Sequence, residues 1–257
     1  MSGMIVERAG PVLEVLFNRP EKKNALTRAM YSAVVEAFQQ ADADPSIRAV
    51  LLSGVGDTFT AGNDISDFQA RAGVSAGAEE TFHASPFLEA LSTLRTPLVM
   101  AVNGAAIGVG TTMLAHADLI VASQTARFVM PFTSLGLVPE AASTLLFPRL
   151  VGLQRANALL MLGEPMDAAT AFQWGLVNKV VAPEDLMATA RDYAARLAAL
   201  PPAAVRRTKQ LIRNGRADVA GRIEDELALF GQQLRSPEAA EAFAAFMEKR
   251  KPDFSRF

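Results

Sequence analysis

Residues 97–118 read PLVMAVNGAAIGVGTTMLAHAD and contain the most apolar segment of the chain. Leu98–Val102 is a continuous apolar run followed by Asn103-Gly104, a typical turn pair, so the pattern predicts a buried strand. Small residues then predict a helix that begins near Gly108. The free N–H groups of a helix N-terminus suit an oxyanion or a phosphate. Close helix packing is an alternative explanation for the glycines.

This glycine-rich stretch does not match the known nucleotide loops. No Gly-Lys-Ser/Thr follows it, which excludes a P-loop. Gly108 and Gly110 fit the first two glycines of the dinucleotide pattern, but Met113 occupies the position of the third. Asn103 and Asp118 interrupt the apolar run, which is too short for the roughly 20 apolar residues of a membrane span.

Strands and helices alternate on both sides of this stretch. Thr27 is a predicted N-cap for a helix through about Gln40, and residues 55–78 are predicted to be irregular. The pattern indicates an α/β fold with a core domain at 1–200 and a C-terminal helical region at 201–257. Further strands are predicted at Val12–Phe17, Ala49–Leu52, Leu119–Ala122, Arg127–Val129 and Val177–Val180, and helices at 144–162, 168–173, 184–199, 202–214, 219–234 and 237–249.

Composition limits the function classes. The chain has 257 residues and a net charge of −2, which argues against nucleic acid as a partner. It has no cysteine, so disulfides and thiolate chemistry are excluded, and its two histidines, His83 and His116, make a histidine metal site unexpected. The N-terminus shows no targeting segment, and we expect a cytoplasmic protein with no membrane partner.

Two further segments contain candidate chemistry. In Phe59–Ile65, small residues allow a ligand to approach the backbone, although an ordinary strand-to-helix loop explains them as well. In Phe128–Ser143, Glu140 is a lone carboxylate among mostly apolar or small residues. Such surroundings disfavour the charged form, raise the pKa and produce a useful base. The alternative is a carboxylate that stabilises the N-terminus of the next helix.

Four segments in this order resemble the crotonase (enoyl-CoA hydratase/isomerase) superfamily over nearly the whole chain. Asn18–Leu26 resembles that family's first CoA-contacting loop, Phe59–Ile65 its first oxyanion segment, and 97–118 its second. Ala168–Val180 resembles a later helix-strand signature. The resemblance implies a spiral of repeated ββα units, a homotrimer or a dimer of trimers, and an acyl-CoA substrate with no other cofactor.

The resemblance also implies a set of site residues. The backbone N–H groups of Asn63 and Val109 are expected to hold the thioester oxygen. Phe246 and Lys249 are similar to a family pair that reaches the CoA of a neighbouring subunit. The remaining implied substrate contacts are Lys22, Ala25, Ala61, Asp64, Ile65, Phe132 and Leu137, and residues 66–90 are expected to shape the acyl pocket.

The acidic positions depart from the hydratase pattern. Family hydratases have one glutamate where this chain has Thr112 and another where it has Phe132. Glu140 is instead similar to the single catalytic glutamate of peroxisomal-type 3-enoyl-CoA to 2-enoyl-CoA isomerases. We therefore expect a double-bond isomerase in which Glu140 is the sole essential base, with Asp64 and Asp67 as reserve candidates. The alternatives are a hydratase or another crotonase-type enzyme, and a non-catalytic acyl-CoA-binding relative.

Overall fold

The computed structural model describes residues 3–64, 85–214, 218–255 and 257, and its strands form two sheets. The larger sheet has six strands in the order β1-β2-β3-β5-β7-β10, and all neighbours are parallel except the β1–β2 pair. Its strands are β1 Met4–Ala9, β2 Val12–Phe17, β3 Ala49–Gly54, β5 Leu98–Val102, β7 Leu119–Ser123 and β10 Lys179–Val181.

The smaller sheet has four strands in the order β4-β6-β8-β9. Consecutive strands of the chain alternate between the sheets: β3 is followed by β4, β5 by β6, and β7 by β8. Each of these pairs therefore carries the chain from the larger sheet to the smaller one, where β4, β6 and β8 lie side by side in chain order. The strands are β4 Thr58–Thr60, β6 Ala105–Ile107, β8 Arg127–Val129 and β9 Met166–Asp167.

Helices cover both faces of the larger sheet. Val50 and Leu52 of β3 belong to the main core with helix α1, whereas Ala49 and Leu51 face helix α8 in a second apolar cluster. Strands buried on both faces are continuous apolar runs rather than alternating ones, which is why sequence patterns identify them. The two helices are α1 Arg28–Ala43 and α8 Leu186–Ala199.

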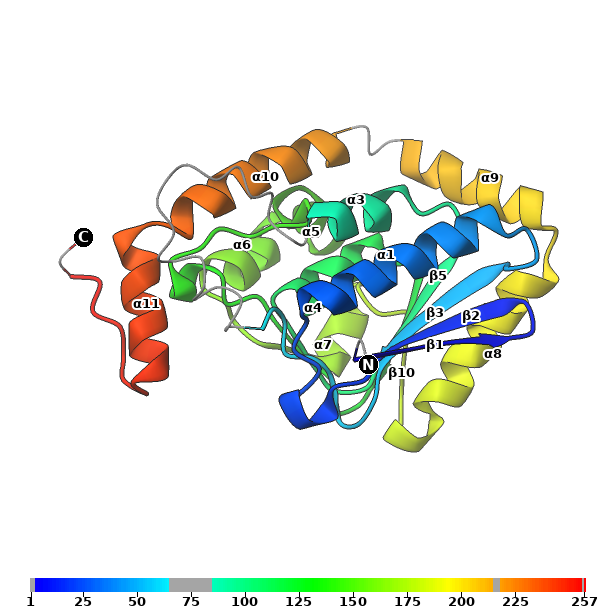
Figure 1. Ribbon diagram of the computed structural model, residues 1–257, viewed down its shortest axis with the longest axis horizontal. Helices are drawn as coiled ribbons and strands as arrows, with labels where there is room; N and C mark the ends of the chain where they lie inside the picture. The colour runs from blue at the N-terminus through cyan, green and yellow to red at the C-terminus, as the bar shows by residue number, and fades with distance from the viewer. Residues whose placement is uncertain (1–2, 65–84, 215–217, 256) are drawn as a thin grey trace.

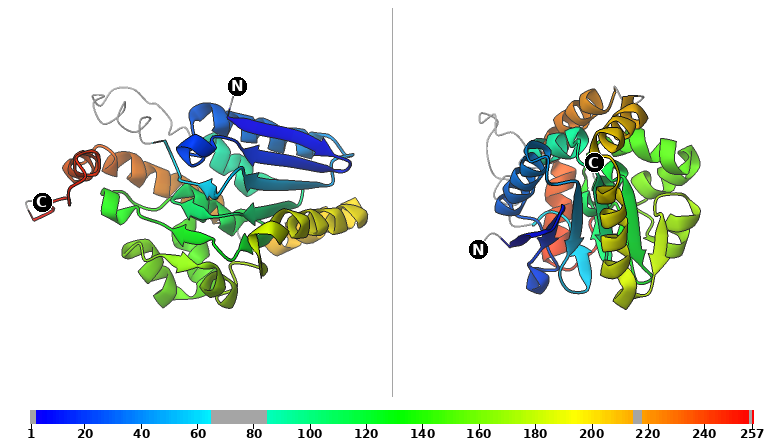
Figure 2. Two further views of the ribbon diagram at one scale, coloured as in Figure 1. Left: turned by 90° about the horizontal axis from the view of Figure 1, so that it is seen from below. Right: turned by 90° about the vertical axis from the view of Figure 1, so that its right-hand side faces the viewer.

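The last three helices follow one another along one side of the molecule and around its end (Figure 1). Figure 2 shows that α11 lies at the opposite end from α8 and α9. Among the described residues, no helix has both the length and the apolar composition needed to cross a membrane. The helices not yet named are α3 Ser85–Thr93, α4 Val109–Thr112, α5 Ser143–Val151, α6 Leu153–Met161, α7 Ala168–Gln173, α9 Pro202–Arg213, α10 Val219–Gln233 and α11 Pro237–Met247, with 3₁₀ turns η1 Pro20–Lys22, η2 Met113–His116, η3 Thr133–Leu135 and η4 Pro183–Asp185.

Most predicted elements are confirmed, and Thr27 caps α1 as expected by accepting a hydrogen bond from the Met30 N–H. Three predictions were wrong in part. Strand β4 lies inside the stretch predicted to be irregular, and α3 begins at Ser85 within the expected 66–90 loop. The predicted helix 144–162 is two helices, because Gly152 adopts a φ of 88° between them. Strands β1, β6 and β9 were not predicted.

Candidate active site

Pairing of β4 with β6 brings the two predicted oxyanion segments together. Thr58 pairs with Ala105 and Thr60 with Ala106. The segments approach so closely that a Cβ atom on Gly62 would lie 2.9 Å from the Ile107 carbonyl oxygen. Because Gly62 also has a φ of 86°, only glycine fits there without strain. The sequence-predicted turns at 61–64 and 107–110 therefore lie side by side.

Both backbone donors predicted for the thioester oxygen are in place at these turns. Val109 is the first residue of α4, so its N–H has no acceptor within the helix. Asn63 forms a parallel bridge with Leu26, in which Leu26 and Asp64 supply the N–H groups, so the Asn63 N–H does not take part. In the part of the chain that the structure describes, neither N–H donates to a protein acceptor.

The first predicted CoA loop is bonded to the same place. The Asn24 side chain accepts from the Arg19 N–H at 2.8 Å and donates to the Thr58 carbonyl oxygen at 2.7 Å. The Ala61 N–H donates to the Lys23 carbonyl oxygen at 2.9 Å. The loop that carries the exposed Lys22 and the half-buried Ala25 therefore lies beside Ala61 and Asp64. All four of these residues are predicted substrate contacts, and a shared substrate requires them to lie close together.

Asp64 has a structural partner. The Arg19 guanidinium lies 3.0 Å from its carboxylate and also donates to the Ala25 carbonyl oxygen at 2.8 Å. Asn63 is held in a similar way, because its side-chain oxygen accepts from the Tyr31 hydroxyl at 2.5 Å. These bonds fix the first oxyanion turn to the CoA loop and to α1. Ile65, the reserve candidate Asp67 and His83 lie outside the described residues.

Glu140 is buried beside the second oxyanion turn. Its side chain is 1% exposed, and its Oε1 accepts from the Thr112 hydroxyl, one helical turn after Val109, at 2.5 Å. Its Oε2 has no hydrogen-bond partner among the described residues. Burial, against the lowering effect of the Thr112 bond and with the nearby Glu226 carboxylate, raises the pKa of Glu140 to about 8. Burial is therefore the main cause of the raised pKa of Glu140, as expected from its apolar surroundings in the sequence.

The backbone after Glu140 is strained. Ala141 and Ala142 have φ angles of 61° and 52°, a left-handed conformation that costs a residue with a Cβ about 1 kcal/mol. His116 contacts the Ala141 carbonyl oxygen through Nε2 at 2.8 Å. Strain of this kind persists only where neighbouring groups hold it. This turn places Glu140 between η3 and α5.

Phe132 and Leu137 are two apolar residues near the oxyanion turns. Both side chains are buried, and the Leu137 N–H donates to the Phe132 carbonyl oxygen at 2.9 Å. The Phe132 ring lies 4.0 Å from the position of a Cβ on Gly108, the residue before Val109. Its other side meets the Phe230 ring of α10 edge-on, with centroids 6.5 Å apart. The predicted pocket-lining position of Phe132 beside the second oxyanion turn agrees with this geometry.

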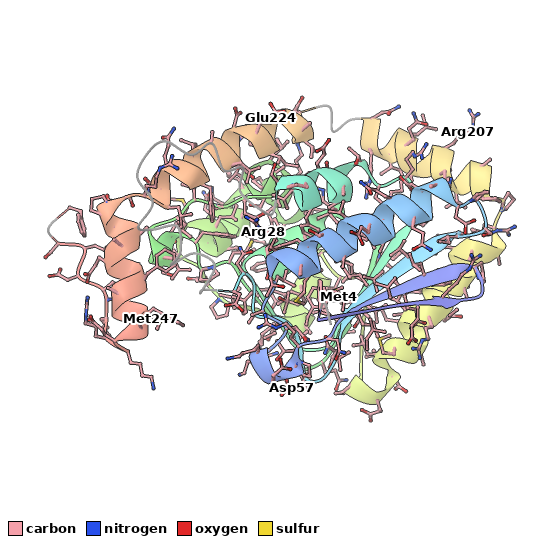
Figure 3. The ribbon with its side chains drawn as sticks, in the orientation of Figure 1. Met4, Arg28, Asp57, Arg207, Glu224 and Met247 are labelled. Atoms are coloured by element: carbon pink, nitrogen blue, oxygen red, sulfur yellow. The ribbon has the colours of Figure 1, made fainter. Side chains whose placement is uncertain are left out.

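The predicted C-terminal contacts do not join this group within one chain. Phe246 is 55% exposed at the end of α11, and Lys249 follows it with an exposed side chain. Met247, between them, lies at the end of the molecule in Figure 3, away from Asp57 near the CoA loop. Their predicted contact with a neighbouring subunit's CoA stays a prediction, as do the oligomeric state and the domain boundary at residue 200.

Two features of the site were missed in the sequence. Thr112 was noted only as the residue in place of a hydratase glutamate, yet its hydroxyl binds the Glu140 carboxylate. Glu226 was not considered, although it interrupts the apolar stripe of α10 between Ile223 and Phe230, which was a readable signal. Both residues act on Glu140 directly, one through a hydrogen bond and the other through charge.

A cavity of about 600 Å³ lies elsewhere, between α9 and the ends of β5 and β7. Its charged residues are paired with one another: Lys209 lies 2.6 Å and Arg213 lies 3.3 Å from the two carboxylate oxygens of Asp118. Burial lowers the pKa of Lys209 to about 8. Because these charges are mutually satisfied, the cavity does not compete with Glu140 as a candidate site.

Comparisons with known proteins agree with the resemblance. A family model described as Enoyl-CoA hydratase/isomerase matches residues 7–256. The chain is 35% identical over 250 residues to 1,2-epoxyphenylacetyl-CoA isomerase of Escherichia coli strain K12, covering 95% of both proteins. It is 34% identical to enoyl-CoA delta isomerase 2 of Rattus norvegicus, covering 97% of this chain and 64% of that one. Other curated relatives have the names of hydratases.

The fold is shared with solved structures. The crystal structure of an enoyl-CoA hydratase/isomerase from Pseudoalteromonas atlantica T6c matches with a TM-score of 0.92 and 44% identity, covering 98% of this chain and all of that one. The predicted α/β class with its repeated ββα units and C-terminal helices is therefore confirmed. The relatives' names include both hydratases and isomerases, so the reaction of this chain has to be argued from its own residues.

Proposed function

Because the chain belongs to the enoyl-CoA hydratase/isomerase family, we propose that it converts 3-enoyl-CoA to 2-trans-enoyl-CoA with Glu140 as the single acid-base residue. One observation carries the proposal. Glu140 is buried beside Val109 while the two hydratase acid positions are occupied by Thr112 and Phe132. The side chain at one of these positions is a donor to Glu140, and the other is an apolar ring.

The isomerisation needs one proton removed from C2 and one returned to C4. In the proposed mechanism the ionised Glu140 carboxylate takes the C2 proton, and the electrons move into a dienolate with its charge on the thioester oxygen. Glu140 then gives the same proton to C4, and the double bond forms between C2 and C3. A single base serves both carbons because they lie on one face of a bent chain. Hydration would additionally require a positioned and activated water.

The arrangement of Glu140 suits this task. Thr112 occupies Oε1, so Oε2 is the oxygen available to exchange a proton. A base with a pKa of about 8 is close to the operating pH, where it accepts and returns a proton with little cost in either direction. The Glu140 side chain is 1% exposed, and this burial keeps water from the carboxyl group.

The dienolate oxygen would be held by the Asn63 and Val109 N–H groups. Each turn is fixed before substrate arrives, by the Tyr31 bond on one side and by the β6–β8 pairing on the other. Preorganised donors of this kind contribute about 3 kcal/mol each to the stability of an oxyanion. The CoA portion would lie along the loop of Lys22 and Ala25, with Ala61 and Asp64 beside it.

A two-substrate assay tests the proposal. The protein is incubated with 3-hexenoyl-CoA and, separately, with crotonyl-CoA, and the absorbance of the conjugated thioester is followed. We expect a rise with the first and little change with the second. A fall with crotonyl-CoA would establish a hydratase instead, and silence with both, together with retained binding, would establish a non-catalytic binding protein.

A variant pair connects the activity to the residue. Glu140→Gln keeps the shape and the bond to Thr112 but removes the base, so turnover should fall by roughly 10²–10⁴-fold while acyl-CoA binding persists. Glu224→Gln makes the same chemical change at an exposed position of α10 and is the matched control. An active Glu140→Gln protein would contradict the proposal, particularly if Asp67→Asn were inactive.

A further inference from the structure

Glu226 lies on α10, and its side chain reaches the segment that carries Glu140. Its side chain is 4% exposed. Its Oε1 accepts from the Thr144 N–H at 3.0 Å and from the Thr144 hydroxyl at 2.5 Å. Arg222, one turn earlier on α10, donates to the Thr144 hydroxyl oxygen at 3.2 Å. A carboxylate of α10 thus satisfies the first donors of α5.

The turn has one internal hydrogen bond, from the Ser143 N–H to the Glu140 carbonyl oxygen at 3.1 Å, and is also held by two side chains from other parts of the chain. Ala141 and Ala142 are both left-handed, and the neighbouring residues on each side of that pair are Glu140 and the first residue of α5. His116 contacts the turn at the Ala141 carbonyl oxygen, and Glu226 binds Thr144, two residues after Ala142, from the other end. Without the Glu226 carboxylate, the α5 donors would lose their acceptor and the turn would relax towards ordinary φ values.

The two carboxyl groups are both buried, and the charge of Glu226 acts on Glu140. Glu140 Oε2, Ser143 Oγ and Glu226 Oε2 are all buried without a hydrogen-bond partner among the described residues. Two carboxylates in such surroundings do not ionise independently. Burial raises the pKa of Glu226, against the lowering effects of the Thr144 hydrogen bonds and of Arg222, and its negative charge opposes the ionisation of Glu140.

The titratable groups around the turn come from four elements. On the turn itself there is Glu140, η2 contributes His116, and α10 contributes Arg222 and Glu226. Arg149 of α5 lies farther out, 3.2 Å from Asp218 in an exposed ion pair. His116 contacts a backbone carbonyl oxygen, and the exposed pair is screened by solvent. Glu226 is therefore the charged group on which Glu140 depends most directly.

We propose that Glu226 is a positioning residue, which holds the turn that carries Glu140 and acts on the Glu140 carboxyl group through its charge. The inference rests on the proposed role of Glu140 as the base, and it extends the site to α10. Glu226 does not touch substrate in this account. It determines the position of Glu140 and the pH at which the Glu140 carboxyl group ionises.

Two variants separate the two effects. In Glu226→Gln the amide oxygen still accepts from the Thr144 N–H and hydroxyl, so the turn is retained and only the charge is lost. The acidic limb of the kcat/KM profile should move to lower pH by about one unit, and the rate at the high-pH plateau should change by less than about threefold. In Glu226→Ala the acceptor is lost as well, and the plateau kcat should fall by about tenfold to a hundredfold.

The control and a second readout keep the test decisive. Glu224→Gln lies on the outer side of α10, as Figure 3 shows, and should leave the pH profile unchanged. The Glu140 carboxyl titration is followed by ¹³C NMR in protein with labelled glutamate, and its resonance is identified by its loss in Glu140→Gln. This measurement does not depend on which acyl-CoA reacts, so it remains valid even if the isomerase assay is silent.

A Glu140 titration that is the same in the parent protein and in Glu226→Gln would overturn the role of charge. A Glu226→Ala protein that folds, as shown by its thermal melt, and keeps its full plateau kcat would overturn the role in positioning. If Glu226→Ala does not fold, Glu226→Asp, which keeps the charge but is shorter by one methylene, takes its place and should show a reduced kcat with the parent pH profile.

Discussion

Replacing Glu140 with glutamine should change how stability depends on pH, and the structure sets the direction. In the folded protein the carboxyl group is buried with a pKa of about 8, whereas the ordinary value is 4.5. Between these two pH values the native state keeps a proton that the unfolded state has released. The native state therefore binds more protons, so the stability of the parent protein falls as pH rises through this window.

The magnitude follows from linkage. Each pH unit of the window removes about 1.4 kcal/mol from the free energy of unfolding of the parent protein, which amounts to about 3 to 5 kcal/mol across its whole width. Glutamine does not titrate, so Glu140→Gln is spared this loss. The stability of the variant relative to the parent should be constant below pH 4.5, increase up to about pH 8, and be constant again above it.

Urea unfolding at pH 5, 6, 7 and 8 measures the effect, with Glu224→Gln as the control for a glutamate in solvent. The glutamine side chain places an amide where Oε2 lacks a partner, and this cost is independent of pH, so the slope rather than the offset is informative. A difference between variant and parent that does not vary with pH would refute the reasoning, because it would mean that Glu140 titrates at its ordinary value.

Four further outcomes are expected. Thr112→Val removes the donor that lowers the pKa of Glu140, so the acidic limb of kcat/KM should move to higher pH, and an unchanged profile would contradict this. Gly136→Ala should cost more than about 2 kcal/mol in urea unfolding, because its Cβ would lie 2.7 Å from the α11 backbone, whereas Gly152→Ala, with open space around it, should cost only the strain of its positive φ. Lys249→Ala should raise the KM for acyl-CoA at low salt, and an unchanged KM would remove this residue from the site. Light scattering at micromolar concentration should show a trimer or a hexamer, and a monomer would exclude contacts shared between subunits.

The sequence alone was sufficient for five of the six strands of the larger sheet, all but β1, and for most helices. Val12–Phe17 and Leu98–Val102 are apolar runs bounded by glycine, proline and asparagine, and strands buried on both faces leave this trace. Among the short strands of the smaller sheet, only Arg127–Val129 was predicted. Thr58–Thr60 and Ala105–Ile107 are three residues each, and their pairing depends on a partner elsewhere in the chain.

The candidate site was predictable where a local pattern marks it. Glu140 is conspicuous as a carboxylate among apolar residues, and the turns at Asn63 and Val109 follow strands. The contribution of Glu226 was not predictable, because it depends on α10 lying across α5. No local sequence pattern shows which helix will pack against which turn. The Thr112 bond was missed for the same reason, because its partner is distant in sequence.

The bond between α10 and the Glu140 turn has a consequence for synthesis of the chain. Both sheets and the two oxyanion turns are complete once residue 181 has emerged, and α8 can cover the larger sheet soon afterwards. The hydrogen bonds between Glu226 and Thr144 form only when residue 226 follows. Since a nascent chain folds from its N-terminus, the two sheets can form first, and Glu140 is fixed in position only when the last helices have been synthesised. A ribosome-bound chain would therefore acquire its shape before its reactivity.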